Sequence, residues 1–241
     1  MRRLLFSAVA LLVVGFTNAR ADILFYGGDI NPNDANSSGL ANERDAIVDY
    51  ARTYQNFVVP VGQTWTITGL FSNNLSQLNP TQGDWTIRTG VSVGNGGTIV
   101  AGSAQTGSVG APLTQTTTGR SAFGYTEYHD EIDGLNVVLG AGTYWFNVTP
   151  WDLGNSGRSF NSNSPTGGLN AVGTTVEDQQ YFDSNFFNQN FANADNDGPF
   201  PRFSDGVIGF VGAPVPEPAS LTLLGLGTLG MFGYRLRRRS A

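Results

Sequence analysis

Oxygen-bearing side chains alternate in one short segment near the end of the chain. The segment Asn193-Ala194-Asp195-Asn196-Asp197-Gly198 has an amide or carboxylate at every second position and glycine at the sixth. This pattern resembles the first half of a calcium loop, in which alternate side chains converge on one ion. The twelfth position is Ser204 instead of a bidentate glutamate, so Asp183 or Asp205 would have to help. An ordinary Asn/Asp turn is the simpler interpretation, and a calcium site at Asn193, Asp195 and Asp197 stays open as the alternative.

Acidic residues also surround the single histidine, His129, in the order Glu127, Asp130, Glu131 and Asp133. A serine hydrolase would pair His129 with the serine of Gly90-Val91-Ser92-Val93-Gly94, but the glycine-rich sequence after it predicts a turn where a helix is required. Two of the acids could serve a glycosidase, which needs two carboxyl groups at a fixed separation. In a hairpin they more simply form a solvated turn. We therefore expect no enzyme, with a glycosidase-like enzyme acting on polysaccharide as the alternative.

The elements that must position these groups are predicted to be short strands. Trp65, Ile67 and Phe71 alternate along one segment, as do Trp85, Ile87, Val91 and Val93 along another; a period of two fits a half-buried strand. Further strands are predicted at 23–26, 54–59, 98–101, 122–128, 134–139, 143–148 and 207–211, and the only candidate helix covers 42–50. The fold class is therefore all-β, a β-sandwich that is jelly-roll-like.

Two further segments are distinguished by composition. Residues 155–173 are rich in Ser, Asn and Gly, which predicts a long exposed loop. Residues 181–191 are rich in aromatic residues and amides. A core strand between polar turns is the favoured interpretation of this second segment, and an aromatic platform that stacks on sugars is the alternative.

Charge is unevenly distributed along the chain. Seven of the 13 basic residues lie near the two ends, whereas 18 of the 19 acids lie between Asp22 and Pro214, which gives that part a formal charge of −12. Nucleic acid is therefore not expected as a partner, because like charges repel. There is no cysteine, so disulfides cannot contribute.

The beginning of the chain is predicted to be a removable signal peptide, residues 1–21. Arg2 and Arg3 precede an apolar segment at 4–16, and Ala19-Arg20-Ala21 has the small-x-small pattern of a cleavage site. Cleavage by signal peptidase between Ala21 and Asp22 would leave residues 22–214 as one exported β-sandwich domain, a size sufficient for a hydrophobic core.

The end of the chain, residues 215–241, is predicted to be a membrane-sorting tail. Pro216, Glu217 and Pro218 form an extended strip, because proline lacks a backbone donor and restricts its neighbour. An uncharged segment at 219–234 follows, long enough for a single transmembrane helix whose arginines reach the membrane surface. The positive-inside rule keeps these arginines cytoplasmic and the preceding domain outside; they are Arg235, Arg237, Arg238 and Arg239.

This order of elements resembles the tail of PEP-CTERM exoproteins. The resemblance implies recognition of the tail by a membrane exosortase, passage through the inner membrane, and release to the cell surface or extracellular matrix. Residues 139–150 and 85–88 are in turn similar to exported domains of unknown function that precede such tails. The expected role is structural, adhesive or glycan-binding, with extracellular polysaccharide as a partner.

Overall fold

The computed structural model describes residues 21–31, 33, 38–103, 110–164, 169–176, 179–194 and 202–212. Within these ranges there is no α-helix, and hence no helix long and apolar enough to cross a membrane. The predicted signal peptide up to residue 20 and the sorting tail lie outside the described residues. The described part is all-β, as predicted.

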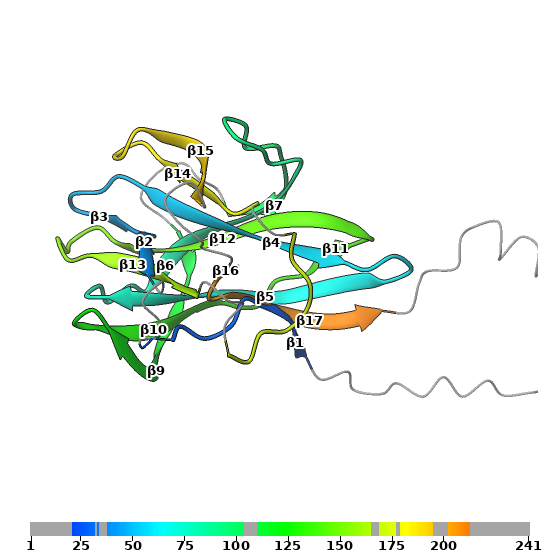
Figure 1. Cartoon of the computed structure of the whole chain (residues 1–241), viewed down its shortest axis with the longest axis horizontal. Coiled ribbons are helices and arrows are strands. Elements are labelled where there is room, and N and C mark those ends of the chain that lie inside the picture. Colours follow the sequence, from blue (N-terminus) through cyan, green and yellow to red (C-terminus); the bar gives the residue numbers. More distant parts are fainter. Residues whose placement is uncertain are drawn as a thin grey trace, which may run out of the picture.

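Two sheets face each other (Figure 1). In the described part of the chain the first sheet has nine strands, whose main path runs β1 (Asp22–Tyr26), β17 (Asp205–Gly212), β5 (Thr64–Ser76), β10 (Tyr125–Ile132) and β9 (Thr114–Ala122). The strands β11 (Val137–Leu139), β13 (Ser159–Ser164), β2 (Ser38–Ala41) and β16 (Arg202–Phe203) join this path at its sides.

The second sheet has eight strands within the same ranges. Its path runs β15 (Gln189–Asn193), β14 (Tyr181–Ser184), β4 (Ala51–Val59), β12 (Gly142–Asp152), β6 (Gln82–Thr89) and β7 (Thr98–Gly102), with β3 (Arg44–Asp45) and β8 (Ala111–Pro112) beside it. The pairings are antiparallel except for β3 with β12. Two antiparallel sheets of this kind are consistent with a β-sandwich.

An apolar core fills one part of the space between the sheets. The alternation predicted for Trp65 and Ile67, and for Trp85 and Ile87, is confirmed, because all four side chains belong to this core. Phe57 is its centre: its ring stacks on Trp65 at 5.8 Å and meets Phe146 edge-on at 5.6 Å. Such aromatic pairs contribute beyond the area that they bury.

The alternation breaks where the strands become irregular. A shift of register between Ile67 and Gly69 of β5 moves Leu70 into the apolar core. Phe71 lies outside that core, where it contacts Tyr26 and His129, so its predicted place beside Trp65 was wrong. Strand β6 ends at Thr89, so Val91 joins a separate cluster with Tyr54 and Trp145, and Val93 is 67% exposed.

Three further predictions from local composition were wrong. Residues 155–173 are not one exposed loop, since they contain β13, in which Ser159, Asn161 and Ser162 are fully buried. Residues 42–50 form no helix; Asp45 accepts the amides of Ile47 and Val48 through its side chain, which competes with helical bonding. The strand predicted at 122–128 is a hairpin between β9 and β10.

Candidate functional site

The outer face of the first sheet holds the most site-like arrangement of side chains. The face consists of alternate residues of β5 and β10 with neighbouring parts of β1, β2 and β13. It has two parts: an aromatic pocket beside the β9–β10 turn, and a polar cluster around His129 further along β10.

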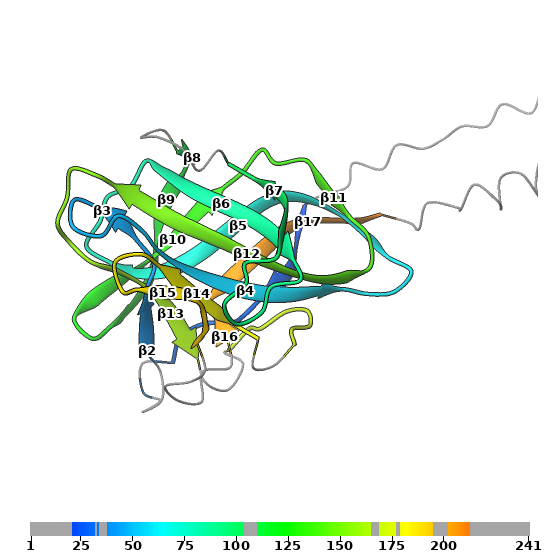
Figure 2. The ribbon, with the colours of Figure 1, turned by 90° about the horizontal axis from the view of Figure 1, so that it is seen from above.

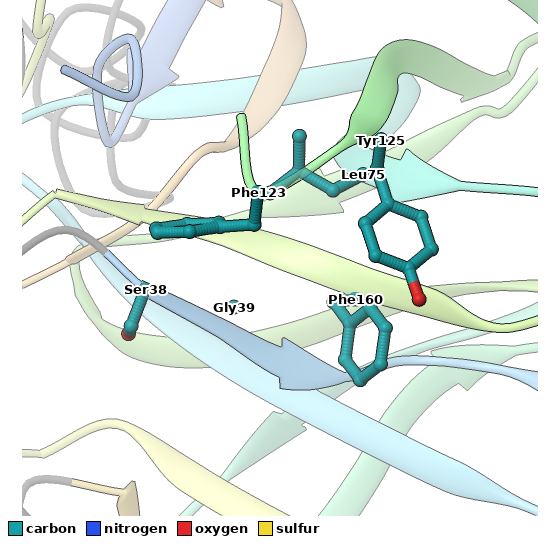
Figure 3. A pocket seen from close by; sticks show the side chains of 6 residues that line it. All are labelled: Ser38, Gly39, Leu75, Phe123, Tyr125 and Phe160. Carbon is teal, nitrogen blue, oxygen red and sulfur yellow. The ribbon is translucent and has the colours of Figure 1, made fainter. Parts of the chain in front are cut away.

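The pocket has a volume of about 330 Å³, within the range of small-ligand sites. Figure 3 shows the rings of Phe123, Tyr125 and Phe160 around the space over Gly39. Tyr125 and Phe160 meet edge to face at 5.5 Å. Leu75 and Ser38 complete the lining.

Gly39 keeps this space open. A Cβ on residue 39 would lie 2.8 Å from Cβ of Phe160, closer than side chains approach one another. Strand β2 therefore passes beside Phe160 only because it carries no side chain at this position.

The turn that presents Phe123 is strained. Phe123 and Gly124 connect β9 to β10 as a two-residue turn, and both have positive φ, 53° and 82°. Hairpin turns of this kind favour Asn-Gly, because asparagine tolerates the left-handed region better than phenylalanine. The strained conformation costs about 1–2 kcal/mol, yet the phenyl ring is 61% exposed and buries little in return.

The pocket wall is electrically neutral. None of its six lining residues is ionisable except Tyr125. Arg158 lies beside the pocket, with its guanidinium 4.9 Å from the ring centre of Phe160. It is already paired with the buried Glu43 at 2.7 Å, so it contributes no free positive charge to attract an anion.

The acids predicted near His129 do not converge. Glu127 and Asp130 are an odd number of positions apart on β10 and so lie on opposite faces of the sheet. Glu127 is buried against Arg120 at 2.5 Å, and Asp130 is buried against Asn74 at 2.8 Å. Glu131 lies 3.5 Å from His129, and Asp133 is exposed beyond the strand end.

His129 is held in place by hydrogen bonds. Its Nδ1–H donates to Asn73 at 3.0 Å, Asn73 donates to the hydroxyl of Tyr26 at 2.9 Å, and Tyr26 donates to Asp29 at 2.7 Å. Burial lowers the pKa of His129, an effect that Glu131 partly offsets, and burial together with Asp29 raises the pKa of Tyr26. Ser92 forms a tight turn through two backbone bonds with Asn95, which confirms the predicted turn and excludes a nucleophile elbow.

A chain of buried polar side chains links the two sheets and was not anticipated. Asp84 accepts from Arg52 at 2.6 Å and contacts Asn147 at 3.5 Å. The chain continues through side-chain hydrogen bonds of 2.8–3.1 Å, in the order Asn147, Thr149, Asn42, Asn74, Asp130 and Gln115. A satisfied network of this kind fixes one relative position of the two sheets.

Only part of the predicted calcium loop is described. Asn193 ends β15, whereas Asp195 and Asp197 lie outside the described residues. Of the two possible helpers, Asp205 is fully buried in the first sheet against Asn161, and Asp183 lies in the second sheet, 4.0 Å from Arg52. Within the described ranges no group of three acidic or histidine side chains is arranged to hold a metal.

The segment 181–191 contains the predicted strand with buried aromatic residues, and the sugar-stacking alternative stays a prediction. It is the β14–β15 hairpin, in which Tyr181, Phe182 and Phe191 are buried. Phe186 and Phe187, at the tip, are 50% and 38% exposed.

Comparison with known proteins assigns the end of the chain. Residues 214–239 match the PEP-CTERM protein-sorting motif, which marks an exosortase substrate, a class of proteins exported and sorted to the cell surface. The resemblance of the tail is thus confirmed, and the motif implies processing by an exosortase. No curated protein and no solved structure matches the chain.

Proposed function

We propose that this exosortase substrate is an adhesive protein of the cell surface or extracellular matrix, and that its exported domain binds neutral polysaccharide without cleaving it. The observation that carries this proposal is the aromatic pocket on the outer face of the first sheet. Its three rings offer flat apolar surfaces of the kind that stack on the C–H face of a pyranose, and Tyr125 and Ser38 offer hydroxyl groups at the rim.

The negative charge of the exported domain favours neutral polysaccharide over anionic polysaccharide as the ligand. The exported domain carries a formal −12, which repels polyanions before contact. The six lining residues include no cation to reverse that effect, and the neighbouring Arg158 is paired with Glu43. The absence of a carboxylate among its lining residues supports binding without hydrolysis, because a glycosidase places two acids across the scissile bond.

Strain at Phe123 supports a role in binding. An exposed ring that holds its backbone in an unfavourable region is costly for stability, and such outliers concentrate at functional sites. Packing alone does not account for a phenyl group that is 61% exposed.

We retain the jelly-roll-like connectivity as part of the proposal. The paths β1-β17-β5-β10 and β4-β12-β6-β7, between which the chain alternates, support it. Jelly rolls occur among lectin domains, although this is an analogy of fold and the pocket carries the argument.

The test uses the processed protein recovered from cells that possess the exosortase, applied to an array of neutral and anionic polysaccharides. We expect selective binding to neutral polymers, and at least tenfold weaker binding for Phe123→Ala. The matched control is Phe186→Ala, which removes a ring of similar exposure from the tip of the other hairpin and should change affinity less than twofold. Equal losses in the two variants, or a preference for polyanions, would overturn the proposal.

A further inference from the structure

The outermost strand of the first sheet, β9, has a free edge. Within the described residues β9 pairs with β10 alone. The pairing is regular from Thr114 to Thr117, each residue opposite one residue of β10, and becomes irregular between Thr117 and Ser121. The side chains of Thr114, Thr116 and Thr117 are exposed.

Free edges are ordinarily protected against pairing with another chain. Lysine, proline, charges that point inward and bulges are the common devices. Residues 114–117 carry none of the first three, and the irregularity begins only after Thr117. Threonine favours extended structure, and threonines opposite one another form favourable cross-strand pairs.

This edge lies in one of two long uncharged stretches of an acidic domain. No charged residue occurs between Arg88 and Arg120. The stretch includes β7 and β8, which belong to the second sheet, and most of β9, which starts close to β8 (Figure 2). On β7, Ile99 and Val100 are 49% and 45% exposed.

From these observations we infer that the β9 edge pairs with the β9 edge of a second copy of this chain, antiparallel across a twofold axis, so that the first sheets of two molecules become continuous. A second copy fits because antiparallel pairing makes one edge complementary to itself. It also fits because an acidic domain repels its own copies, whereas residues 114–117, which would pair with one another, carry no charge. The regular part is short, so the contact is weak and forms where sorting concentrates the protein. This inference is independent of polysaccharide binding.

The absence of cysteine from the chain allows a direct test. Four variants of the full chain, Thr114→Cys, Gln115→Cys, Thr116→Cys and Thr117→Cys, are exported from cells that possess the exosortase and oxidised on the intact cells. Residues opposite one another in antiparallel strands lie about 4.5–5.5 Å apart at Cα, within reach of a disulfide. We expect a disulfide-linked dimer whose yield is greatest at the residue nearest the twofold axis and falls along the strand.

The matched control is Thr126→Cys, exposed like Thr116 but on β10, which is paired on both sides with β5 and β9. It should stay monomeric. A second substitution is then added to whichever of Thr114→Cys, Gln115→Cys and Thr117→Cys gives the most dimer. Thr116→Lys should abolish the dimer of that variant, whereas Thr126→Lys should not. Protease resistance equal to the parent shows that each variant is folded. Folded variants that give no dimer, dimer yields equal to the control, or crosslinks to a different protein would each overturn the inference.

Discussion

Asp130 is a buried acid at a junction of the polar chain between the sheets. Its two carboxylate oxygens accept from Asn74 at 2.8 Å and from Gln115 at 2.9 Å. Within the part of the chain that the structure describes no cation is paired with it, and its side chain is completely buried. Burial therefore raises the pKa of Asp130 from about 3.8 to about 7, even though the two hydrogen bonds act in the opposite direction.

The consequence for stability has a definite sign. Because the folded protein holds this proton more tightly than the unfolded chain, the stabilisation is fully present below about pH 4 and is lost as pH rises toward about 7. At 1.36 kcal/mol per pH unit, the interval corresponds to an upper bound of roughly 4 kcal/mol in the free energy of unfolding.

Asp130→Asn should remove this pH dependence. The new amide keeps an oxygen toward Asn74, whose own amide is fixed by Asn42 and Ser72. Its nitrogen then faces Gln115, which is only half-buried and can rotate its amide to present the oxygen.

The measurement is urea unfolding of the processed protein at pH 4, 6 and 8, followed by tryptophan fluorescence. Compared with the parent, the variant should have a lower free energy of unfolding at pH 4 and a higher one at pH 8. The difference in this free energy between pH 4 and pH 8 should therefore be smaller in the variant than in the parent by one to several kcal/mol. Asp133→Asn removes the same formal charge at an exposed position and serves as control. A variant of Asp130 that retains the parent's full pH dependence would refute the assignment of a buried protonated carboxyl group.

Three other outcomes are expected. Phe123→Asn should stabilise the processed protein by about 0.5–1 kcal/mol in urea unfolding, because asparagine suits the left-handed turn, while it weakens polysaccharide binding; a loss of stability would contradict the strain argument. Intact-mass analysis of surface-extracted protein should show a chain that starts at Asp22 and lacks Arg235 to Arg239, and Glu217→Gln should leave precursor in the inner membrane; a surface protein that retains the arginines would count against processing at the motif. If the Asn193 loop binds calcium, about 10 mM calcium should raise the melting temperature, because extracellular modules bind calcium with dissociation constants of about 0.1–1 mM. An equal rise in melting temperature in the double variant Asp195→Asn/Asp197→Asn would mean that calcium acts by general charge screening.

The sequence predicted the all-β class and most strands because apolar alternation reports burial directly. Trp65, Ile67, Trp85 and Ile87 all face the core as expected. Errors arose where a local irregularity shifts the alternation, as between Ile67 and Phe71. Such a shift depends on pairing with β17, far along the chain, so no local pattern contains it.

The candidate pocket was not predicted, although one local signal for it exists. Phe123-Gly124 lies where a two-residue turn would separate two strands, and recognition of that turn would have placed an exposed ring at a hairpin tip. The other walls come from β2, β5 and β13. Their convergence is a property of the sheet order, which the sequence does not state.

The polar interior explains why β13 was mistaken for a loop, and also what that strand contributes to the pocket. Ser159 and Asn161 are fully buried, and the side-chain amide of Asn161 donates to Asp205 at 2.6 Å and to Thr53 at 3.1 Å. The backbone amide of Ser159 donates to Glu43 at 2.5 Å. Since side chains alternate along a strand, Phe160 between them must face outward, into the pocket. The buried polar contacts thus hold this part of the pocket wall in place, and a composition typical of a loop here positions an aromatic ring in the pocket.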